Sequence, residues 1–440
     1  MITRRGFAIA LLGIIILSSG YSLGNYFLLT MGIFFIFSTI IAYPILTLNS
    51  TFVNLTVERT LDKEKVFAGD FIYVTVKVTN KTNRPLTDVE IFDTYPEIFN
   101  LVLGSNKIRT RLGRGESITF SYILQCPIRG LFTLGPTQIL FHDTFGYHFD
   151  SAVISSETPI LVYPTYEDIK KLKAMAQKRR LGLMFGIHKT KIKGMGTDFY
   201  GIRPYDPSDE LRYVDWKATA RTGQLRTKEF ESEKNIRVMV LLDVSSSMGA
   251  GATLENKLEY GIRAALLLSH LALERRDLVG LTTFSDEVEG IIEPRTGKTH
   301  FYRILELLAE VIPHGGKNYL EAAKFSNRYL KRGALVILIS DLEGNVKNLK
   351  EALKFLRANE HNILIIAPFG PWFEVKRTEL SPLDKALVEA TSFQLWRERK
   401  EIIKDLTRMG IDVINVGPDD FLPVVVSTYM KAKKKGIGAV

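Results

Sequence analysis

The sequence predicts a multidomain protein with two N-terminal transmembrane helices, an all-β domain, and a C-terminal α/β domain with a doubly wound, Rossmann-like sheet. Three observations predict this fold class. Residues 6–57 contain no charged residue and no histidine, residues 53–163 alternate apolar and polar side chains, and residues 235–418 alternate apolar strands with amphipathic helices. These patterns are typical of a membrane hairpin, a half-buried sheet and a parallel sheet covered by helices. The expected domain ranges are 1–50, 51–165, 166–234 and 235–440.

Two apolar segments, Gly6 to about Gly24 and Asn25 to Leu48, are joined by a short turn. Each is long enough to cross a hydrocarbon layer of roughly 30 Å. Arg4 and Arg5 favour a cytoplasmic N-terminus. Because a hairpin returns the chain to the same side, we expect a two-span membrane protein with its soluble domains in the cytoplasm. The alternative is a signal peptide, because two arginines, a short apolar core and the small residues 18–20 also fit one.

The segment from about Val53 to Tyr163 contains short strands separated by Gly, Pro and Asn, which favours an immunoglobulin-like sandwich. Cys126 is the only cysteine, so it forms no internal disulfide, and we expect it in the core. We interpret His142 and His148 as surface residues of a loop rather than as a metal-binding pair. Nothing in this domain indicates catalysis, so we expect a binding surface or a spacer above the membrane.

Polar side chains follow two apolar strands of the C-terminal domain. Asp243 ends one predicted strand and opens the sequence Asp-Val-Ser-Ser-Ser-Met-Gly, and Asp341 ends another. Ligands of open α/β sheets bind at the carboxyl ends of strands, so we expect both carboxylates to converge there with Ser245 and Ser247. Hard oxygens suit Mg²⁺ or another divalent cation such as Mn²⁺ or Ca²⁺. The alternative is that these side chains only cap the following helix.

The rest of this domain is expected to follow the same alternation of strands and helices. A long amphipathic helix is expected over about 254–276, a short antiparallel edge strand from Val288, and a basic, frayed tail over 431–435. Parallel strands are expected at 238–243, 279–284, 335–341, 363–368 and 411–416.

The spacing of these residues resembles the von Willebrand factor A (vWA) domain with its metal-ion-dependent adhesion site (MIDAS). The resemblance rests on Asp243, Ser245 and Ser247, which match D-x-S-x-S, and on the later Asp341. It implies a divalent cation whose open position is completed by a carboxylate of a partner. A middle loop of that family supplies a threonine, and this chain has Lys317 there. An ammonium repels a dication or replaces it between the aspartates, so both a metal-bound and a lysine-filled site stay open.

The segment between the two soluble domains begins with a basic stretch over about 166–183, which predicts a helix with a solvated face or one that contacts anionic lipid or an acidic partner. A flexible link is expected over 182–196. A block mixing Arg, Asp, Trp and Tyr follows. We expect it either to brace the α/β domain through salt bridges of its arginines with its aspartates or to bind a partner. Its candidate residues are Arg203, Tyr205, Asp209, Arg212, Asp215, Trp216, Lys217 and Arg221.

Together with Asp198, Phe199 and Ala220, this block has the form G-x-[DE]-F…R-x-Y…D-x-x-R-x-[IV]-D-W-K-x-x-A-R. It closely resembles DUF58, a family of uncharacterised membrane-anchored proteins, and with the other domains the resemblance covers nearly the whole chain. The resemblance implies association with a MoxR-type AAA+ ATPase in another chain, and hence a role in assembling or remodelling protein complexes.

The formal net charge of +10 fits contact with an anionic membrane surface or an acidic partner. No helix-turn-helix, zinc-finger or aromatic RNA-binding motif indicates nucleic acid, and no zincin, P-loop or nucleophile-elbow motif indicates an enzyme. We therefore expect a non-enzymatic, membrane-anchored protein-binding module. Its expected partners are membrane lipid and a MoxR-type AAA+ ATPase or the client of that ATPase. The alternative is a cell-surface adhesin or an envelope scaffold with both soluble domains outside.

Overall fold

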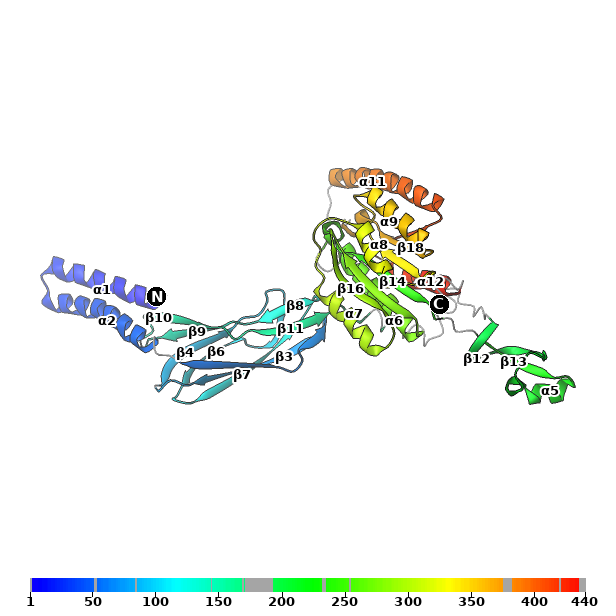
Figure 1. Cartoon of the computed structure of the whole chain (residues 1–440). Helices are drawn as coiled ribbons and strands as arrows, with labels where there is room; N and C mark the ends of the chain where they lie inside the picture. The colour runs from blue at the N-terminus through cyan, green and yellow to red at the C-terminus, as the bar shows by residue number, and fades with distance from the viewer. Residues whose placement is uncertain are drawn as a thin grey trace. The chain divides into compact units, whose positions relative to one another are not determined.

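The computed structural model divides into two compact units, Met1–Tyr163 and Pro164–Val440 (Figure 1). The predicted basic helix over 166–183 falls almost wholly outside the described residues. These are residues 2–50, 54–83, 85–143, 145–167, 170, 193–231, 235–252, 255–374, 382–418 and 421–434.

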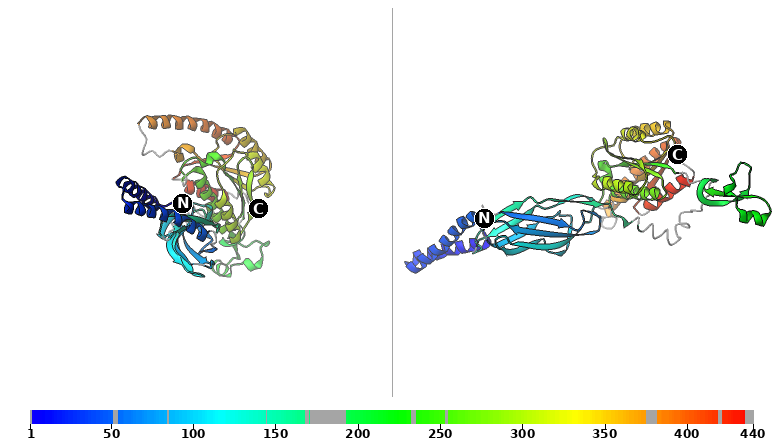
Figure 2. Two further views of the ribbon diagram at one scale, coloured as in Figure 1. Left: turned by 90° about the vertical axis from the view of Figure 1, so that its left-hand side faces the viewer. Right: turned by 60° about the horizontal axis from the view of Figure 1, so that its bottom comes forward.

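The first unit opens with two apolar helices, α1 (Arg4–Leu23) and α2 (Tyr26–Ser50), which lie side by side (Figures 1 and 2). Gly6, Gly13 and Gly20 are the buried residues of α1. A Cβ on Gly20 would lie 2.8 Å from a backbone nitrogen of α2, so glycine is required for this approach. Small residues at a helix contact are typical of membrane helices. By length and composition, both helices are able to cross a membrane.

The β domain contains three sheets, all antiparallel except for the pairing of β2 with β11. One sheet has the order β1 (Leu55–Leu61), β3 (Phe71–Asn80), β7 (Ser117–Gln125), β5 (Asn100–Gly104). A second has the order β10 (Phe149–Ile154), β9 (Thr137–His142), β4 (Leu86–Asp93), β6 (Lys107–Leu112). The third has the order β2 (Lys65–Phe67), β11 (Thr158–Tyr163), β8 (Gly130–Leu134).

The core of this domain follows the predicted period of two. Alternate residues of β3 are fully buried, and they pack in one cluster with inward-facing residues of β4, β7, β9 and β11. Cys126 lies in that cluster, as expected, and burial raises the pKa of its thiol to about 12. Arg59 and Asp93 form a buried ion pair between two of the sheets, and Tyr122 Oη donates to Asp93 at 2.7 Å. The immunoglobulin-like class stays a prediction.

The second unit begins, in its described part, with an antiparallel pair of strands, β12 (Lys193–Pro204) and β13 (Arg226–Glu231). Between them lie the short 3₁₀-helix η1 (Leu211–Tyr213) and helix α5 (Trp216–Thr222). The flexible link expected up to residue 196 is wrong for residues 193–196, because these belong to β12, which pairs with the end of β13. Residues 182–192 of that expectation lie outside the described residues.

The α/β domain has a six-stranded sheet in the order β16-β15-β14-β17-β18-β19. All neighbours are parallel except β15 and β16, so the expected antiparallel edge strand is confirmed. The strands are β14 (Arg237–Asp243), β15 (Leu278–Phe284), β16 (Val288–Arg295), β17 (Leu335–Ile339), β18 (Asn362–Pro368) and β19 (Asp412–Val416). Each parallel strand lies within two residues of its predicted range at both ends.

Helices cover both faces of this sheet. On one face α6 (Lys257–Glu274) packs on β14 and β15 and contacts α7 (Lys298–Glu310) and α12 (Phe421–Lys434). On the other face lie α8 (Tyr319–Asn327), α9 (Val346–Ala358) and α11 (Pro382–Arg408), which share a buried core with β14, β17 and β18. The short helix α10 (Gly370–Glu374) follows β18.

Two details of the α/β domain differ from expectation. Helix α6 begins at Lys257 because Asn256 caps it, accepting a hydrogen bond from the Glu259 backbone nitrogen at 2.8 Å. The frayed-tail prediction is wrong for residues 431–434, which continue α12. Lys433 Nζ donates to both carboxylate oxygens of Asp277 at 2.8 and 2.9 Å, which ties this last turn to the turn before β15. Residue 435 lies outside the described residues.

Candidate functional site

Three loops meet at the carboxyl ends of the parallel strands. The loop after β14 includes the 3₁₀-helix η2 (Ser246–Gly249), the second follows β15, and the third precedes α8. His314 N donates to Val244 O at 3.0 Å, and Ser246 N donates to the Gly315 carbonyl oxygen at 3.1 Å. Asn318 N donates to Ser285 O at 2.8 Å. These backbone hydrogen bonds hold the third loop against the other two.

Two glycines shape the third loop. Gly315 has a φ of +65°, in the left-handed region that glycine adopts without strain. A Cβ on either Gly315 or Gly316 would lie 2.5 Å from a carboxylate oxygen of Asp286. Gly316 N donates to Asp286 Oδ2 at 2.8 Å. The pair therefore lets the backbone turn closely around Asp286, and the turn delivers Lys317 to the strand ends.

The four residues predicted to form the site come together. Ser247 Oγ donates to Asp341 Oδ2 at 2.8 Å, and Ser245 Oγ lies 3.3 Å from Ser247 Oγ. Asp243 accepts hydrogen bonds from Ser245 N at 2.9 Å and from Ser340 Oγ at 2.6 Å. The alternative that these side chains cap the next helix is wrong, because another residue caps α6 and Ser245 makes no side-chain cap bond to η2.

Two lysines contact these carboxylates, and one of them, Lys317, lies between the two aspartates. Lys317 Nζ lies 3.3 Å from Asp243 Oδ2 and forms an ion pair with Asp341 Oδ1. Lys257 Nζ lies 2.9 Å from Asp341 Oδ2 and 3.3 Å from Glu343 Oε1. Only 6% of the Lys317 side chain and 1% of the Lys257 side chain are exposed. We call Asp243, Ser245, Ser247, Lys257, Lys317, Asp341 and Glu343 the strand-end cluster.

The charges of the strand-end cluster are strongly coupled. Burial disfavours ionisation of Asp341, but the charges of Lys317 and Lys257 and their hydrogen bonds outweigh it and lower its pKa to about 2. Burial raises the pKa of Asp243, and the attraction of Lys317 only partly offsets this effect. Burial and the neighbouring Asp341 charge raise the pKa of Glu343. Asp341 is thus the carboxylate that the lysines hold ionised most firmly.

The donor set does not fit a divalent cation. Asp341 Oδ1 faces Lys317, while Asp341 Oδ2 accepts from Lys257 and Ser247. Asp243 Oδ2, the oxygen nearest Lys317, already accepts from Ser340. A cation between the aspartates would lie beside two ammonium groups and compete with them for the same oxygens. Among the described residues, no group of three or more His, Cys, Asp or Glu side chains is arranged to hold a metal ion.

Lys257 and Arg399 were missed by sequence reasoning. Lys257 is the first residue of α6, where the helix macrodipole favours an acidic residue. A lysine at this position is unusual, and the sequence alone could have indicated that it has a special role. Arg399 of α11 is buried and donates to the carbonyl oxygens of Asp341 at 2.8 Å and Ala367 at 2.9 Å. Burial lowers the pKa of Arg399 to about 10. Its guanidinium fixes the backbone at the ends of β17 and β18, and no local pattern indicated it.

The block that mixes Arg, Asp, Trp and Tyr, residues 196–225, is called the signature segment here, and some of its charged residues pair with one another. Arg203 pairs with Asp209, as predicted, and Tyr205 Oη donates to the Asp209 carbonyl oxygen at 3.2 Å. Asp215 accepts from Ala218 N at 3.0 Å and caps α5. The predicted pairing of Arg212 with an aspartate is wrong, because Arg212 Nε lies 2.6 Å from Glu210 Oε2.

The remaining predicted residues of the signature segment lie on the surface of α5. Trp216 is 65% exposed, and Lys217 and Arg221 are also exposed. Arg221 lies in the last turn of α5, where a cation interacts favourably with the helix macrodipole. The side chains of Asp198 and Phe199 lie outside the described part of the chain. The segment thus places an aromatic ring and two basic groups on one exposed turn-and-helix unit.

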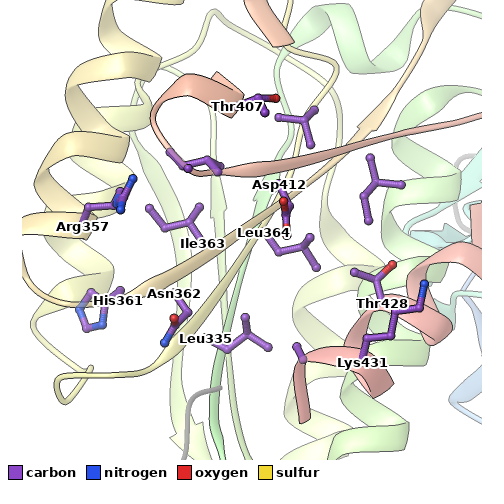
Figure 3. Close-up of a pocket in the computed structure, with 15 residues that line it drawn as sticks. Leu335, Arg357, His361, Asn362, Ile363, Leu364, Thr407, Asp412, Thr428 and Lys431 are labelled. Atoms are coloured by element: carbon purple, nitrogen blue, oxygen red, sulfur yellow. The ribbon is translucent and has the colours of Figure 1, made fainter. Parts of the chain in front are cut away.

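A hollow of about 540 Å³ lies at the amino ends of strands β17, β18 and β19, opposite the strand-end cluster (Figure 3). It is lined by the first residues of β17, β18 and β19 together with Arg357, His361 and Lys431. Burial lowers the pKa of His361, whose Nε2 lies 2.8 Å from Asn327 Oδ1. Ligands of open α/β sheets bind at the carboxyl ends of strands. The strand-end cluster is therefore the stronger candidate.

A family model described as "Protein of unknown function DUF58" matches residues 201–368. The match spans much of the signature segment and the sheet from β14 to β18, so the predicted resemblance to DUF58 is confirmed over that range. An uncharacterized protein of Bacillus subtilis, YeaD, is 27% identical over 255 residues, 57% of this chain and 61% of YeaD. The chain therefore spans less than two thirds of the length of this curated relative.

Solved structures give a weaker comparison. The chain is similar to the conserved hypothetical protein BatB from Bacteroides thetaiotaomicron, with 19% identity, a TM-score of 0.32, and coverage of 46% of this chain and 100% of BatB. It is also similar to a von Willebrand factor type A structure from Catenulispora acidiphila, with 12% identity, a TM-score of 0.31, and coverage of 46% and 43% respectively. At these TM-scores, the description of the α/β domain rests on its own strand order.

Proposed function

We propose that this protein is a non-enzymatic, membrane-anchored protein-binding module that works with a MoxR-type AAA+ ATPase in assembling or remodelling protein complexes. Its α/β domain captures an acidic side chain of the partner at the strand-end cluster, a MIDAS-like site in which lysine replaces the metal. The observation that carries the proposal is the position of Lys317 Nζ between Asp243 and Asp341. The choice of ATPase rests on the resemblance to DUF58 alone.

Lys317 is the cation of the cluster that a partner reaches. An ammonium has three N–H donors. Among the described residues, the carboxylates of Asp341 and Asp243 are its ion-pair partners, which leaves one donor for a third acceptor. Lys317 retains some exposed surface, whereas Lys257 is sealed in. A carboxylate of the partner is the acceptor that forms the strongest hydrogen bond with this group.

The charged groups of the strand-end cluster and the adjoining Arg399 balance one another. The negative groups Asp243, Asp341 and Glu343 are matched by Lys257, Lys317 and the buried Arg399, whose guanidinium bonds the Asp341 backbone. These six groups therefore carry no net negative charge; a further carboxylate, that of Asp286, accepts from Gly316 N beside the same loop. A buried ion pair across an interface also excludes partners that lack the complementary charge.

The helical hairpin supports the membrane-anchored part of the proposal. The close approach of α1 and α2 at glycine is typical of packing between membrane helices, where small residues let backbones meet. Arg4 and Arg5, at the start of α1, favour a cytoplasmic N-terminus. A hairpin then keeps both soluble domains on the cytoplasmic side, where an ATP-driven partner works.

The alternative is an adhesin or envelope scaffold with the soluble domains outside, which requires the first segment to act as a signal peptide. Gly20, within the small-residue stretch that suggests cleavage, packs against Leu28 and Leu29 of α2. This contact favours an uncleaved hairpin. Protease treatment of intact cells separates the two proposals, because cytoplasmic domains are protected and external domains are digested.

Binding of the full-length protein in nanodiscs to the MoxR-type ATPase of the same organism tests the proposal. Lys317→Met is expected to weaken binding by roughly tenfold or more, because the charged contact is lost. The matched control is Lys350→Met, which removes another paired lysine, 2.7 Å from Asp405 on the α9 side of the domain. With the ATPase free of nucleotide, which it would bind together with Mg²⁺, EDTA is expected to leave wild-type binding unchanged. Equal binding by both variants would contradict the proposal, and loss of binding in EDTA would contradict its metal-free form.

A further inference from the structure

The loop between β9 and β10 is a tight, hydrogen-bonded turn. We call residues 143 and 145–148 the aromatic loop; Thr144 lies outside the described residues. Asp143 N donates to His148 O at 3.2 Å, and Gly146 N donates to Asp143 O at 3.0 Å. His148 N donates to Asp143 Oδ1 at 3.0 Å. These hydrogen bonds fix the conformation of the loop between the two strands.

The backbone of the aromatic loop lies directly on the first turn of α1. Thr3 N donates to Tyr147 O at 2.8 Å, and Thr3 Oγ1 donates to Gly146 O at 2.6 Å. A Cβ on Gly6 would lie 2.3 Å from Tyr147 O, so glycine is required at this contact. The loop and the start of the first apolar helix thus form one packed unit.

The same loop contacts the second apolar helix. His148 is buried, and its Nε2 lies 2.7 Å from Thr39 O within α2. The His148 ring also packs edge-on against the Tyr43 ring, with centroids 5.4 Å apart. His148 therefore bridges the β domain to α2, which is a different role from the surface-loop position expected from the sequence.

These contacts place the aromatic loop at the end of both candidate membrane spans. The spans run over Arg4–Leu23 and Tyr26–Pro44. The loop contacts Thr3 and Gly6 at the start of the first span. Thr39 lies five residues before the end of the second span, which is about 7.5 Å along a helix axis. The loop therefore lies at the height where hydrocarbon gives way to headgroups.

The side chains at this height suit that layer. The Phe145 and Tyr147 rings stack at a centroid distance of 5.5 Å and an interplanar angle of 20°. Phe145 is 67% exposed, although exposure of a large aromatic ring to water is unfavourable. Tyr43 of α2 is exposed at the same level. Tyrosine and tryptophan gather at membrane–water interfaces, where an apolar ring and a polar end are both accommodated, and the apolar Phe145 ring would leave water there.

We infer that the aromatic loop binds the lipid–water interface, with Phe145 and Tyr147 inserted among the lipid headgroups. The inference rests on the proposed membrane hairpin and goes beyond it. The hairpin alone tethers the β domain, whereas the loop seats one end of that domain on the bilayer. The β domain is then a fixed support rather than a free spacer.

Site-directed fluorescence tests this inference in the full-length protein. Because Cys126 is fully buried, a new surface cysteine is labelled selectively with the environment-sensitive dye NBD, and labelling of the wild type checks this selectivity. The test variant is Phe145→Cys. The matched control is Val153→Cys, 60% exposed on the strand that follows the loop, and Phe34→Cys, 66% exposed, reports the middle of α2. The vesicles contain phosphatidylcholine and phosphatidylglycerol with doxyl-lipid quenchers at shallow or deep positions.

At position 145, we expect stronger quenching by shallow than by deep quenchers, together with blue-shifted emission. Position 153 should show neither effect, and position 34 should be quenched most by the deep quencher. If position 34 is quenched and position 145 is not, the aromatic loop faces water and the inference is wrong while the hairpin stands. If position 34 is not quenched either, the membrane hairpin and the inference fail together.

Discussion

The strand-end cluster and the signature segment both concentrate charged residues, but they hold them in opposite ways. In the cluster, Asp341 bonds to Ser247 and Lys257, which lie 94 and 84 residues away, and the side chains of Lys257 and Asp341 are at most 1% exposed. In the signature segment, Arg203 and Asp209 are six residues apart, and 34% of the Arg203 side chain is exposed.

This difference separates buried charged residues, which stabilise the fold, from exposed ones, which are accessible to a partner. Removing one partner of a buried ion pair leaves an uncompensated charge in a low dielectric. An exposed pair is stabilised little by its attraction, because water and salt screen it. Changes in the cluster should therefore affect stability as well as binding, whereas changes on the surface of α5 should affect binding alone.

The largest expected effect is on stability and comes from Lys257→Met. It leaves the buried Asp341 with a single lysine and removes the ion pair with Glu343. We expect a loss of about 3–5 kcal/mol in the free energy of unfolding, measured by urea titration with tryptophan fluorescence, since Trp372 and Trp396 pack together in the α/β domain. The exposed control, Arg212→Ala, should change the free energy of unfolding by about 0.5 kcal/mol or less. Similar losses of unfolding free energy for both variants would show that buried and exposed ion pairs do not differ as proposed.

The next effect concerns metal binding. Lys317→Thr removes the ammonium between the aspartates and introduces the hydroxyl found in metal-binding vWA domains. We expect Mg²⁺ to raise the melting temperature of this variant, with about 2.7 kcal/mol of stabilisation at 100 times the dissociation constant. The melting temperature of the wild type should not respond to Mg²⁺. A response of the wild type equal to that of the variant would show that the lysine does not replace a cation.

A smaller effect is expected from acid. The lysines lower the pKa of Asp341 from 3.8 to about 2, so its charge stabilises the fold above pH 4 and this contribution, about 2 kcal/mol, is lost as the pH falls to about 2. The raised pKa of Asp243 acts in the opposite sense, since its protonation favours the folded state. Between pH 5 and pH 2, the free energy of unfolding, measured by urea titration at each pH, should fall more steeply for the wild type than for Asp341→Asn. Parallel curves would argue against coupling to the lysines.

The smallest effect on stability is expected on α5. Trp216→Ala should change the free energy of unfolding by about 0.5 kcal/mol or less, because the ring is exposed. It should nevertheless weaken binding of the ATPase, since tryptophan is a frequent centre of binding energy at interfaces. Circular dichroism during heating measures the change in stability, and the nanodisc assay measures the change in ATPase binding. Asp215→Ala is a useful comparison, because loss of this helix cap costs about 1 kcal/mol. A large loss of stability from Trp216→Ala would indicate a structural brace instead.

Local patterns were enough to predict the strands of the α/β domain and the convergence of Asp243 with Asp341. Apolar runs bounded by turn residues define the strands, and parallel strands bring their carboxyl ends to one edge. The middle loop also brought Lys317 to the predicted place. In the β domain the alternation of β3 identified its buried face in the same way. The strands and their buried faces depend on neighbouring residues, and the common direction of parallel strands then brings the ends of remote segments together.

Contacts that no pattern in the sequence assigns to a partner were not predicted. The basic residue at the start of α6 is unusual, but nothing near Lys257 or Arg399 in the chain reveals that both contact Asp341. The pairing of Arg212 was wrong because Asp215 is already used as a helix cap and Glu210 is closer. By contrast, the glycines at positions 6, 13 and 20, spaced by seven, were a readable sign of close helix packing in α1.

The lysine between the aspartates also bears on how such a site is controlled. A bound ion is acquired after folding, is lost to chelators and follows the supply in its compartment. A side chain is covalently part of the polypeptide, so the positive charge is present in every folded copy. Changes in the magnesium or manganese concentration should then leave the positive charge between the aspartates unchanged. Under the proposed function, control over partner binding would come from the partner or from movement of the loop that carries Lys317.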